Sequence, residues 1–301
     1  MSDQVCVVGE VLIDLIPDGD QDLAVVGGGP ANTAKALAKL GVKTYFIDGI
    51  STDKYGQMAK VVLLSANVIL DYAHYSNKPT CTAKVTLAKS GSASYEFVIE
   101  DTATFDFSDH WLPDPQSLKP SLLHIGTLAT IIEPGASVLF EWTKSVAHIA
   151  PIVFDPNIRP AVLSDRDEYV KKVEKWVEIS SAVKVSDEDL NWLYPGKAIV
   201  KVVNEWLEVG VQLVVVTLGD KGITAYRKSE EISVDAVKVD VADTVGAGDT
   251  VGAVLVEAIV KNGLDRLTGE VLETMLHRAV KAAAITISRT GANPPSKEEI
   301  D

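Results

Sequence analysis

The sequence at residues 213–222 is Leu-Val-Val-Val-Thr-Leu-Gly-Asp-Lys-Gly, a short apolar run followed at once by a polar, glycine-containing turn. A run rich in β-branched residues without polar alternation is typical of a strand that is buried on both faces. The same pattern recurs at 122–125, 151–154 and 182–185. Segments of helical length lie between the runs, at 137–146, 169–179 and 198–209. This order predicts an α/β fold in which helices flank both faces of a mostly parallel sheet, as a three-layer sandwich.

Two regions depart from this pattern because their apolar residues alternate with polar ones. One spans residues 80–99 around a turn at 89–92, and the other spans 10–26 around a turn at 17–20. Alternation of this kind predicts hairpins with one face toward solvent. We expect both hairpins to form one small antiparallel sheet that acts as a lid over a crevice. The predicted organisation is a single domain over 1–301, with a lid from about 10–26 and 80–105 inserted in it.

The composition is that of an ordinary globular protein. The chain has 301 residues, of which 47% are hydrophobic, and a net charge of −14. A chain this acidic repels phosphate backbones and anionic lipids, so we expect neither nucleic acid nor a membrane as a partner. The two cysteines, Cys6 and Cys81, are expected to be buried, reduced thiols. Without a signal-peptide pattern or a long uncharged apolar run, the expected location is the cytoplasm.

The motif with the clearest chemistry is Asp-Thr-Val-Gly-Ala-Gly-Asp at residues 243–249, which precedes a predicted helix over 252–261. Gly246, Ala247 and Gly248 then lie at a helix N-terminus, where free backbone N–H groups and the helix dipole favour an anion. A lone acidic residue in a first helical turn commonly compensates the dipole. Asp249 instead competes with an anion for the same N–H groups, and we interpret it as a carboxylate beside a bound phosphate.

A second glycine cluster, Gly-Gly-Gly-Pro-Ala-Asn at 27–32, precedes a predicted helix over 31–40. The cluster is compatible with a strained turn alone. It does not match the dinucleotide-binding spacing G-x-G-x-x-G, because Asn32 stands where the third glycine belongs. An Asn at the edge of a site offers both a donor and an acceptor to a hydroxyl group.

Other enzyme classes are excluded by the motifs that the sequence lacks. It contains no P-loop G-x-x-x-x-G-K-[ST], no H-R-D or D-F-G motif, no G-x-S-x-G, and no pair of histidines at zinc-binding spacing. Polar turns follow several predicted strands, at 155–157, 186–189 and 219–222. Each alone is typical of a helix cap, but together they predict a ligand site at the carboxyl edge of the sheet.

The motif at 243–249, the cluster at 27–32 and the order of elements over nearly the whole chain resemble the ribokinase-like (PfkB) family of sugar kinases. The segments 9–17, 27–32 and 155–159 are most similar to those of fructokinases within that family. The resemblance implies a ribokinase-like fold and transfer of the ATP γ-phosphate to a sugar primary hydroxyl. We therefore expect conversion of D-fructose to fructose 6-phosphate, with ATP, Mg²⁺ and K⁺ as cofactors, by a monomer or by a homodimer formed through the lid.

The resemblance also implies a role for each matching residue. Asp249 would be the general base, and the amides of Gly246, Ala247 and Gly248 would bind the transferring phosphoryl group. The residues implied to bind the sugar are Asp14, Gly28, Asn32, Asn157 and Arg159. Those implied at the nucleotide and Mg²⁺ are Lys184, Ser186, Asp189, Thr217, Gly219 and Gly222. Those implied at a monovalent-cation site are Asp243, Val245, Arg289 and Gly291.

Three features depart from the family pattern. Ser186 and Asp189 replace the usual Asn and Glu, Val251 replaces a common Phe, and residues 95–105 lack the Arg and Ala-Asp pattern of fructokinase lids. Ribokinase and 2-keto-3-deoxygluconate kinase therefore remain as alternative activities. A non-catalytic sugar sensor and a dinucleotide-dependent oxidoreductase are further alternatives, opposed by the presence of Asp249 and by the broken glycine spacing.

Overall fold

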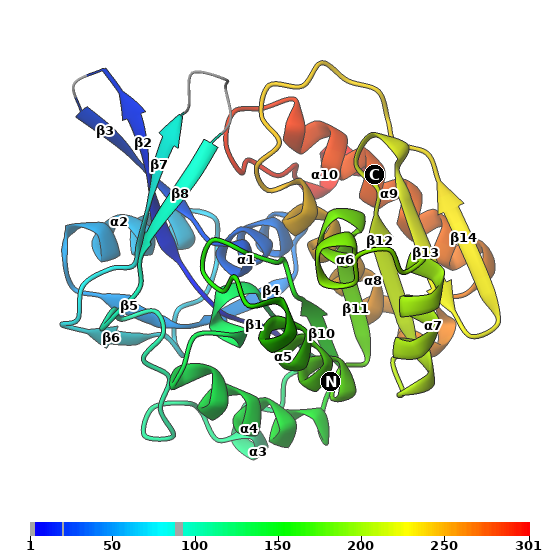
Figure 1. Ribbon diagram of the computed structural model, residues 1–301, viewed down its shortest axis with the longest axis horizontal. Helices are drawn as coiled ribbons and strands as arrows, with labels where there is room; N and C mark the ends of the chain where they lie inside the picture. Colours follow the sequence, from blue (N-terminus) through cyan, green and yellow to red (C-terminus); the bar gives the residue numbers. More distant parts are fainter. Residues whose placement is uncertain (1–3, 20, 88–92) are drawn as a thin grey trace.

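The computed structural model describes residues 4–19, 21–87 and 93–301, and its centre is an eight-stranded sheet (Figure 1). The strand order is β14-β13-β12-β11-β10-β9-β1-β4. Every pairing from β4 to β12 is parallel, and β13 and β14 are added antiparallel. The strand bounds are β1 (Gln4–Val8), β4 (Lys43–Ile47), β9 (Leu122–Gly126), β10 (Ile152–Asp155), β11 (Ala182–Ser186), β12 (Leu213–Thr217), β13 (Ile223–Arg227) and β14 (Glu230–Val234).

Helices cover both faces of this sheet, which confirms the predicted three-layer α/β fold. Alternate strand residues face opposite sides, so Val5 and Val7 join one hydrophobic core while Cys6 and Val8 join the other. The first core is covered by α1 (Gly29–Lys39), α2 (Lys54–Ser65), α8 (Ala247–Asn262) and α9 (Gly269–Ile287). The second is covered by α3 (Pro115–Leu118), α4 (Gly135–Ala147), α5 (Arg166–Glu178), α6 (Asp187–Leu193) and α7 (Ile199–Glu208). Short elements complete the chain: η1 (Thr127–Thr130), η2 (Gly219–Lys221), η3 (Leu264–Arg266) and α10 (Lys297–Ile300).

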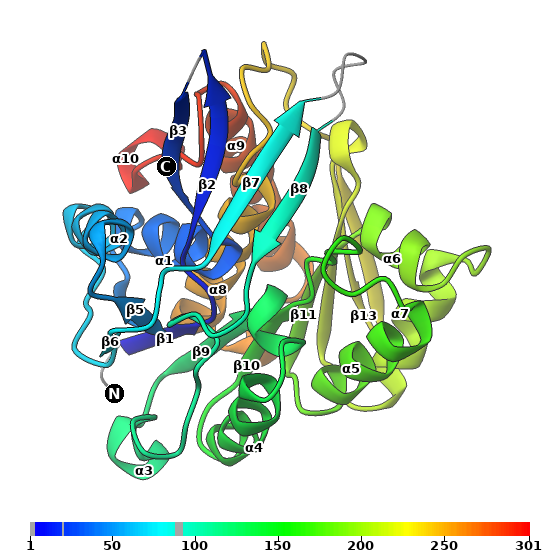
Figure 2. The ribbon, with the colours of Figure 1, turned by 60° about the vertical axis from the view of Figure 1, so that its left-hand side comes forward.

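A second, four-stranded sheet rises from the body of the molecule (Figure 2). Its order is β3 (Gln21–Gly27), β2 (Leu12–Asp18), β7 (Thr82–Leu87) and β8 (Ala93–Val98). The two predicted hairpins therefore meet, but β2 and β7 pair in parallel, so the expectation of a wholly antiparallel sheet was wrong. Both strands start at the base of the small sheet and run outward, which makes their shared edge parallel (Figure 2). The turn expected at 89–92 lies outside the described residues.

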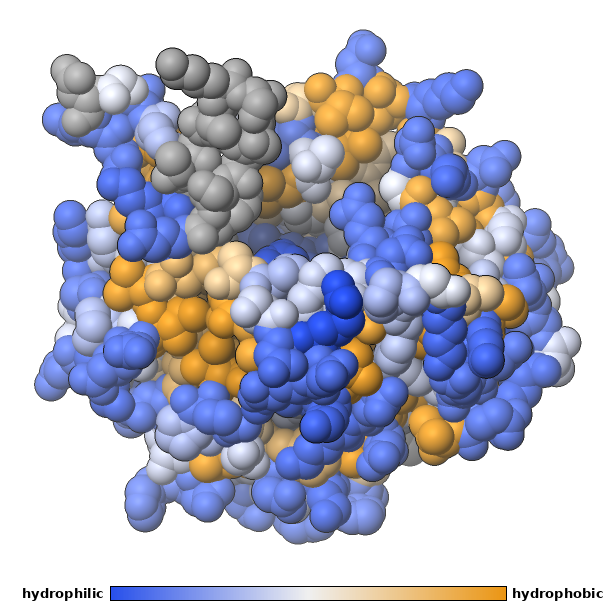
Figure 3. All heavy atoms as spheres, in the orientation of Figure 1, coloured by the Kyte–Doolittle hydropathy of each residue, from blue (hydrophilic) through white to orange (hydrophobic). Residues whose placement is uncertain are grey.

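The small sheet stands beside the carboxyl ends of the parallel strands (Figure 1). In the same orientation the surface next to it is hollowed (Figure 3). A parallel pair, β5 (Gly49–Ser51) and β6 (His74–Ser76), lies near its base. Cys6 and Cys81 are buried and unpaired, as expected. Within the described ranges, no helix combines the length and apolar character needed to cross a membrane.

Candidate active site

The first turn of α8 presents backbone N–H groups that no side chain caps. Gly246 is the N-cap and adopts a left-handed conformation, with φ of +82°. A side chain there would also collide, because a Cβ atom would lie 2.8 Å from Cβ of Ala292. Thr250 holds the turn in place by donating to the Gly246 carbonyl at 2.8 Å. The 16-residue helix thus directs an open, electropositive end into the site, as the sequence predicted.

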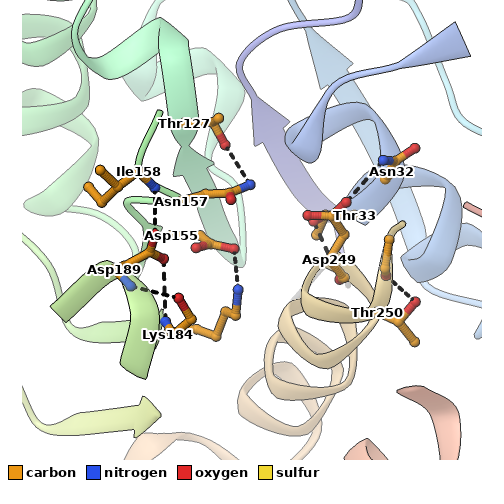
Figure 4. Close-up of polar contacts among 12 residues, drawn as sticks. Asn32, Thr33, Thr127, Asp155, Asn157, Ile158, Lys184, Asp189, Asp249 and Thr250 are labelled. Atoms are coloured by element: carbon orange, nitrogen blue, oxygen red, sulfur yellow. Dashed lines mark hydrogen bonds and ion pairs between the residues drawn. The ribbon is translucent and has the colours of Figure 1, made fainter. Parts of the chain in front are cut away.

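Asp249, in this first turn, contacts the first turn of α1. The Asn32 amide nitrogen donates to Oδ2 of Asp249 at 2.9 Å, and the Thr33 hydroxyl approaches the Asp249 carbonyl at 3.4 Å (Figure 4). Asn32 and Asp249 are both buried, and the side-chain oxygen Oδ1 of Asn32 has no protein partner among the described residues. A buried acceptor of this kind is normally paired, so Asn32 is ready to accept a hydrogen bond from a ligand.

The environment of Asp249 makes it a stronger base than an ordinary aspartate. Burial raises its pKa to about 6, and the charge of Asp155 acts in the same direction. Lys184, the hydrogen bond from Asn32 and the charge of Arg159 limit the rise. A carboxylate with a pKa near 6 remains largely ionised at neutral pH and accepts a proton more readily than one near 4. This property suits a general base.

Lys184 and Asp155 form a buried ion pair beneath the same helix end. They project from the neighbouring strands β11 and β10, their charged atoms are 2.9 Å apart, and their side chains are 6% and 3% exposed. Burial opposes the charge on Lys184, but Asp155 raises its pKa above the ordinary value, so the amine is a cation. Its Nζ is 2.9 Å from where a Cβ on Gly248 would lie, which puts the positive charge against the open turn of α8.

Two residues with left-handed backbones face Asp249 from the ends of β9 and β10. Thr127 has φ of +58° and Asn157 has φ of +39°, and the Asn157 amide donates to the Thr127 hydroxyl at 3.4 Å. A Cβ on Gly29 would lie 2.9 Å from Oγ1 of Thr127, 3.0 Å from Nδ2 of Asn157 and 3.4 Å from Oδ1 of Asp249. Polar atoms of Thr127, Asn157 and Asp249 therefore pack closely around Gly29, and a larger residue would collide with them.

Asp14, Gly28 and Arg159 complete this half of the site. Burial raises the pKa of Asp14 to about 6, and the nearby Arg159 charge opposes the rise. Gly28 has φ of +106°, and a Cβ there would lie 2.4 Å from the Glu10 carbonyl oxygen. Arg159 donates to the carbonyls of Asn157 and Ile158, at 3.3 and 3.0 Å. The Arg159 charge acts on both Asp14 and Asp249, and Asn32 contacts Asp249 directly. A role of these residues at a sugar stays a prediction.

Ser186 and Asp189 lie at the start of α6, where they form a capping box. The Asp189 carboxylate accepts from Ile158 N at 3.0 Å and from Ser186 N at 3.4 Å, so both of its oxygens contact backbone amides. It therefore ties the 157–159 loop to α6. Among the described residues, no three His, Cys, Asp or Glu side chains are grouped as metal ligands. A magnesium ion held mostly by phosphates and water needs no such group.

Thr217, Gly219 and Gly222 follow β12 at the same edge of the sheet. Thr217 pairs in register with Ser186, which places this turn next to α6. Gly222 has φ of +102°, and a Cβ there would lie 2.1 Å from the Val234 carbonyl oxygen. The segment that follows β14 carries three valines, at 237, 239 and 241, which are 45%, 37% and 60% exposed. These exposed valines therefore lie in the segment that follows directly on residues 234–236, which Gly222 contacts.

The predicted cation residues join two loops behind α8. The Asp243 carboxylate accepts from Val245 N at 3.0 Å and from Gly291 N at 2.8 Å. The Arg289 side chain instead pairs with Glu299, near α10, so only its backbone stays with the two loops. Asp243 thus joins the backbones of Val245 and Gly291, and a cation site at this place stays a prediction.

Sequence reasoning gave no individual role to three residues of the site, Thr127, Asp155 and Glu10, although Asp155 belongs to one of the polar turns that predicted a ligand site. Thr127 and Asp155 lie at the ends of two predicted strands, which was the available signal. Glu10 is 1% exposed and accepts from Ala129 N at 3.2 Å, which anchors the turn that carries Thr127. Burial raises its pKa to about 8.

Comparison with known proteins gives one consistent result. The profile of the pfkB family carbohydrate kinases matches residues 2–299. A fructokinase of Rhizobium leguminosarum bv. trifolii is 33% identical over 261 residues, which cover 85% of this chain and 79% of the relative. A fructokinase of Klebsiella pneumoniae is 28% identical over 310 residues, which cover 100% and 99%.

Solved structures agree with these relatives. Fructokinase from Xylella fastidiosa with bound ATP has a TM-score of 0.92 at 24% identity, covering 100% of this chain and 97% of that one, and so shares the fold. A fructokinase double mutant from Vibrio cholerae O395, in a form with bound fructose, ADP and potassium ion, has a TM-score of 0.82 at 27% identity, covering 96% and 93%.

Proposed function

Since the chain belongs to the pfkB family of carbohydrate kinases, we propose that it phosphorylates D-fructose at the 6-hydroxyl, with ATP as the donor. The observation that carries the proposal is the placement of Asp249, a buried carboxylate with a raised pKa, in the uncapped first turn of α8. A base and an anion site are then adjacent, as phosphoryl transfer to a hydroxyl requires.

In the proposed mechanism, Asp249 takes the proton of the attacking hydroxyl. The amides of Gly246, Ala247 and Gly248 stabilise the charge on the transferring phosphoryl group, since they already point into the site and need not reorganise. Lys184, against Gly248, adds positive charge at this place. Mg²⁺, when it is bound with the nucleotide, would neutralise part of the negative charge on the phosphate oxygens.

We assign the acceptor sugar to the space between Asp249 and the small sheet. Asp14, Asn32, Asn157 and Arg159 offer donors and acceptors there, and Gly28 leaves room for a close approach. Fructose is favoured as the acceptor because the relatives described above are fructokinases and the similar fructokinase from Vibrio cholerae O395 has bound fructose.

ATP fits the other half of the site in this proposal. Thr217, Gly219 and Gly222 would meet its phosphates and ribose, and the exposed valines at 237–241 offer an apolar surface for the base. Ser186 and Asp189 would act by positioning the 157–159 loop beside Mg²⁺ and the phosphates. Asp243 and the backbone at Val245, Arg289 and Gly291 would hold K⁺, since they supply only oxygen ligands.

The chain is proposed to act as one domain whose small sheet closes over the sugar as a lid. Closure would exclude water and so limit ATP hydrolysis. The enzyme would be a monomer or a homodimer that pairs through this sheet. Use of ATP, with both cysteines as free thiols, favours the cytoplasm as its location.

The test is a comparison of kcat/KM for fructose, ribose, 2-keto-3-deoxygluconate and adenosine with ATP and Mg²⁺, with NMR to locate the new phosphate. We expect fructose to give the highest value and the phosphate to be on its 6-oxygen. A tenfold higher kcat/KM for another sugar contradicts the proposal that fructose is the acceptor, but it remains consistent with sugar kinase activity. Sugar binding without ADP formation for any acceptor contradicts the kinase activity and favours a sensor.

A further inference from the structure

Thr127 stands out because it is a β-branched residue in a left-handed conformation at the site. Five non-glycine residues in the described part of the chain have positive φ, and two of them, Thr127 and Asn157, lie at the ends of adjacent strands facing Asp249. Such a conformation costs about 1–3 kcal/mol in a residue other than glycine and is rarest for β-branched ones. The surrounding structure must therefore enforce it.

Three hydrogen bonds fix the turn that carries Thr127. The Thr130 hydroxyl donates to the Thr127 carbonyl at 2.6 Å. Glu10 accepts from Ala129 N at 3.2 Å, and the Trp176 indole donates to the Thr130 carbonyl at 2.9 Å. These contacts come from β1's end, from α5 and from within the turn, so the backbone of Thr127 has no freedom to relax. Its side chain is held in one direction, toward the site.

Asn157 is fixed in a similar way. Arg159 donates to the Asn157 carbonyl at 3.3 Å, and Asp189 accepts from the next backbone amide, that of Ile158, at 3.0 Å. The two fixed side chains contact each other through the 3.4 Å bond from the Asn157 amide to the Thr127 hydroxyl. Figure 4 shows this pair on one side of the site and Asp249 with Asn32 on the other.

The hydroxyl of Thr127 therefore has a hydrogen to donate. Its oxygen accepts from Asn157, and no described residue accepts from it. It lies 2.9 Å from where a Cβ on Gly29 would be, a position that is 3.4 Å from Oδ1 of Asp249. A donor fixed this close to the proposed base faces the place where the acceptor sugar must bring its hydroxyls. Thr127 as a whole is 4% exposed, so water has little access to it.

We propose that Thr127 is a specificity-determining residue, whose hydroxyl donates a hydrogen bond to a sugar hydroxyl other than the one that Asp249 activates. The inference rests on the proposed function and adds a contact that discriminates between sugars. A site built to hydrogen-bond a hydroxyl disfavours an analogue without it, because the protein group is then left unpaired.

The test combines two substitutions at 127 with deoxy sugars. Thr127→Val keeps the shape and β-branching and removes the hydroxyl, whereas Thr127→Ser keeps the hydroxyl. Thr143→Val is the matched control, because Thr143 is a buried threonine on α4 whose hydroxyl has no partner among the described residues. The substrates are fructose and its 1-, 3- and 4-deoxy forms, with kcat, KM and calorimetric Kd measured for each.

We expect Thr127→Val to lower kcat/KM for fructose about tenfold, mainly through KM, and to have no effect on the one deoxy sugar that lacks the partner hydroxyl. Thr127→Ser and Thr143→Val should stay within about threefold of wild type. An equal loss on fructose and on every deoxy sugar, or no loss at all, overturns the inference. A wild-type preference for another sugar contradicts the proposed acceptor instead, and the deoxy forms of that sugar then replace those of fructose.

Discussion

The Asn32 side-chain amide donates a 2.9 Å hydrogen bond to Oδ2 of Asp249. The two residues are 217 positions apart in the chain, and their bond joins the first turn of α1 to the first turn of α8. This bond occupies Oδ2, whereas Oδ1 lies 3.4 Å from where a Cβ on Gly29 would be and accepts no hydrogen bond from a described residue. One oxygen of the proposed base is thus held by the protein and the other is free for substrate.

The first prediction concerns Asp249 itself. Asp249→Asn keeps the shape of the side chain but cannot accept a proton, so kcat should fall by about a hundredfold or more. The Kd for fructose, measured by calorimetry without ATP, should change by less than about fivefold. A variant with near wild-type kcat would remove Asp249 from the role of base.

The second prediction concerns the pH dependence of kcat/KM. The base acts in its ionised form, so activity should decline as the pH falls through the Asp249 pKa of about 6. The Asp155 charge helps to raise that pKa, and Asp155→Asn leaves Lys184 in place to lower it further. The midpoint of the acidic limb should therefore move to lower pH. Asp167→Asn, on the exposed face of α5, is the control and should leave the midpoint unchanged, whereas an upward or absent shift in Asp155→Asn contradicts the assignment.

The third prediction concerns potassium. Each Asp243 oxygen accepts a single backbone hydrogen bond, which leaves lone pairs for a cation between the 243–245 and 289–291 loops. Turnover should be faster in K⁺ than in tetramethylammonium at equal ionic strength, and Asp243→Asn should reduce that difference. Asp240→Asn, at an exposed position nearby, should retain it. Equal wild-type rates in both salts count against a cation site.

The fourth prediction compares two glycines with left-handed backbones. Gly41 has φ of +82° and open space around it, so Gly41→Ala should cost about 1–2 kcal/mol of unfolding free energy from backbone strain alone. Gly28 has φ of +106°, and a Cβ there would lie 2.4 Å from the Glu10 carbonyl oxygen, so Gly28→Ala should cost more. Urea denaturation of both variants measures the difference. Equal losses would show that the loop at Glu10 yields without strain.

The sequence was sufficient to predict the sheet and its flanking helices because both depend on local periodicity. The start of α8 was predicted only in part. The motif placed a helix N-terminus at 246–248, but the apolar helical pattern was recognised only from residue 252, and the structure begins the helix at Ala247. The intervening Gly248 and Gly252 have low helix propensity, and packing of α8 against α1 overrides it. The parallel pairing of β2 with β7 was also beyond reach, because it depends on where two distant hairpins leave the body.

The residues of the candidate site also differ in whether a local sequence pattern could predict them. Asp249 and Asn32 were predictable from motifs that act near their own helix ends. Thr127, Asp155 and Glu10 matter only because β1, β9, β10 and β11 are neighbours in the sheet, and no local pattern contains that order. For Asp189 the family resemblance implied a role at Mg²⁺, which stays a prediction, and the structure adds that both carboxylate oxygens accept from backbone amides.

The last prediction concerns His124, which lies on β9 beneath α8. Its side chain is 1% exposed, and neither ring nitrogen has a partner among the described residues. Burial lowers the pKa of this imidazole to about 3, and the charge of Lys184 acts in the same direction. The ordinary pKa of a histidine is about 6.5. Between about pH 6.5 and pH 3, His124 is therefore protonated in the unfolded chain but neutral in the native protein.

The native state should therefore lose stability as the pH falls through this window, by up to about 1.4 kcal/mol per pH unit from His124 alone. His124→Leu removes the titrating group and two unpaired polar atoms, so it should stabilise the protein more at pH 5 than at pH 8. Urea denaturation at both values measures this difference in unfolding free energy. His110→Leu, at an exposed position, is the control and should shift the unfolding free energy equally at both. If His124→Leu also gives equal shifts, the imidazole is protonated in the native state, and Lys184 cannot be the neighbour that keeps it neutral.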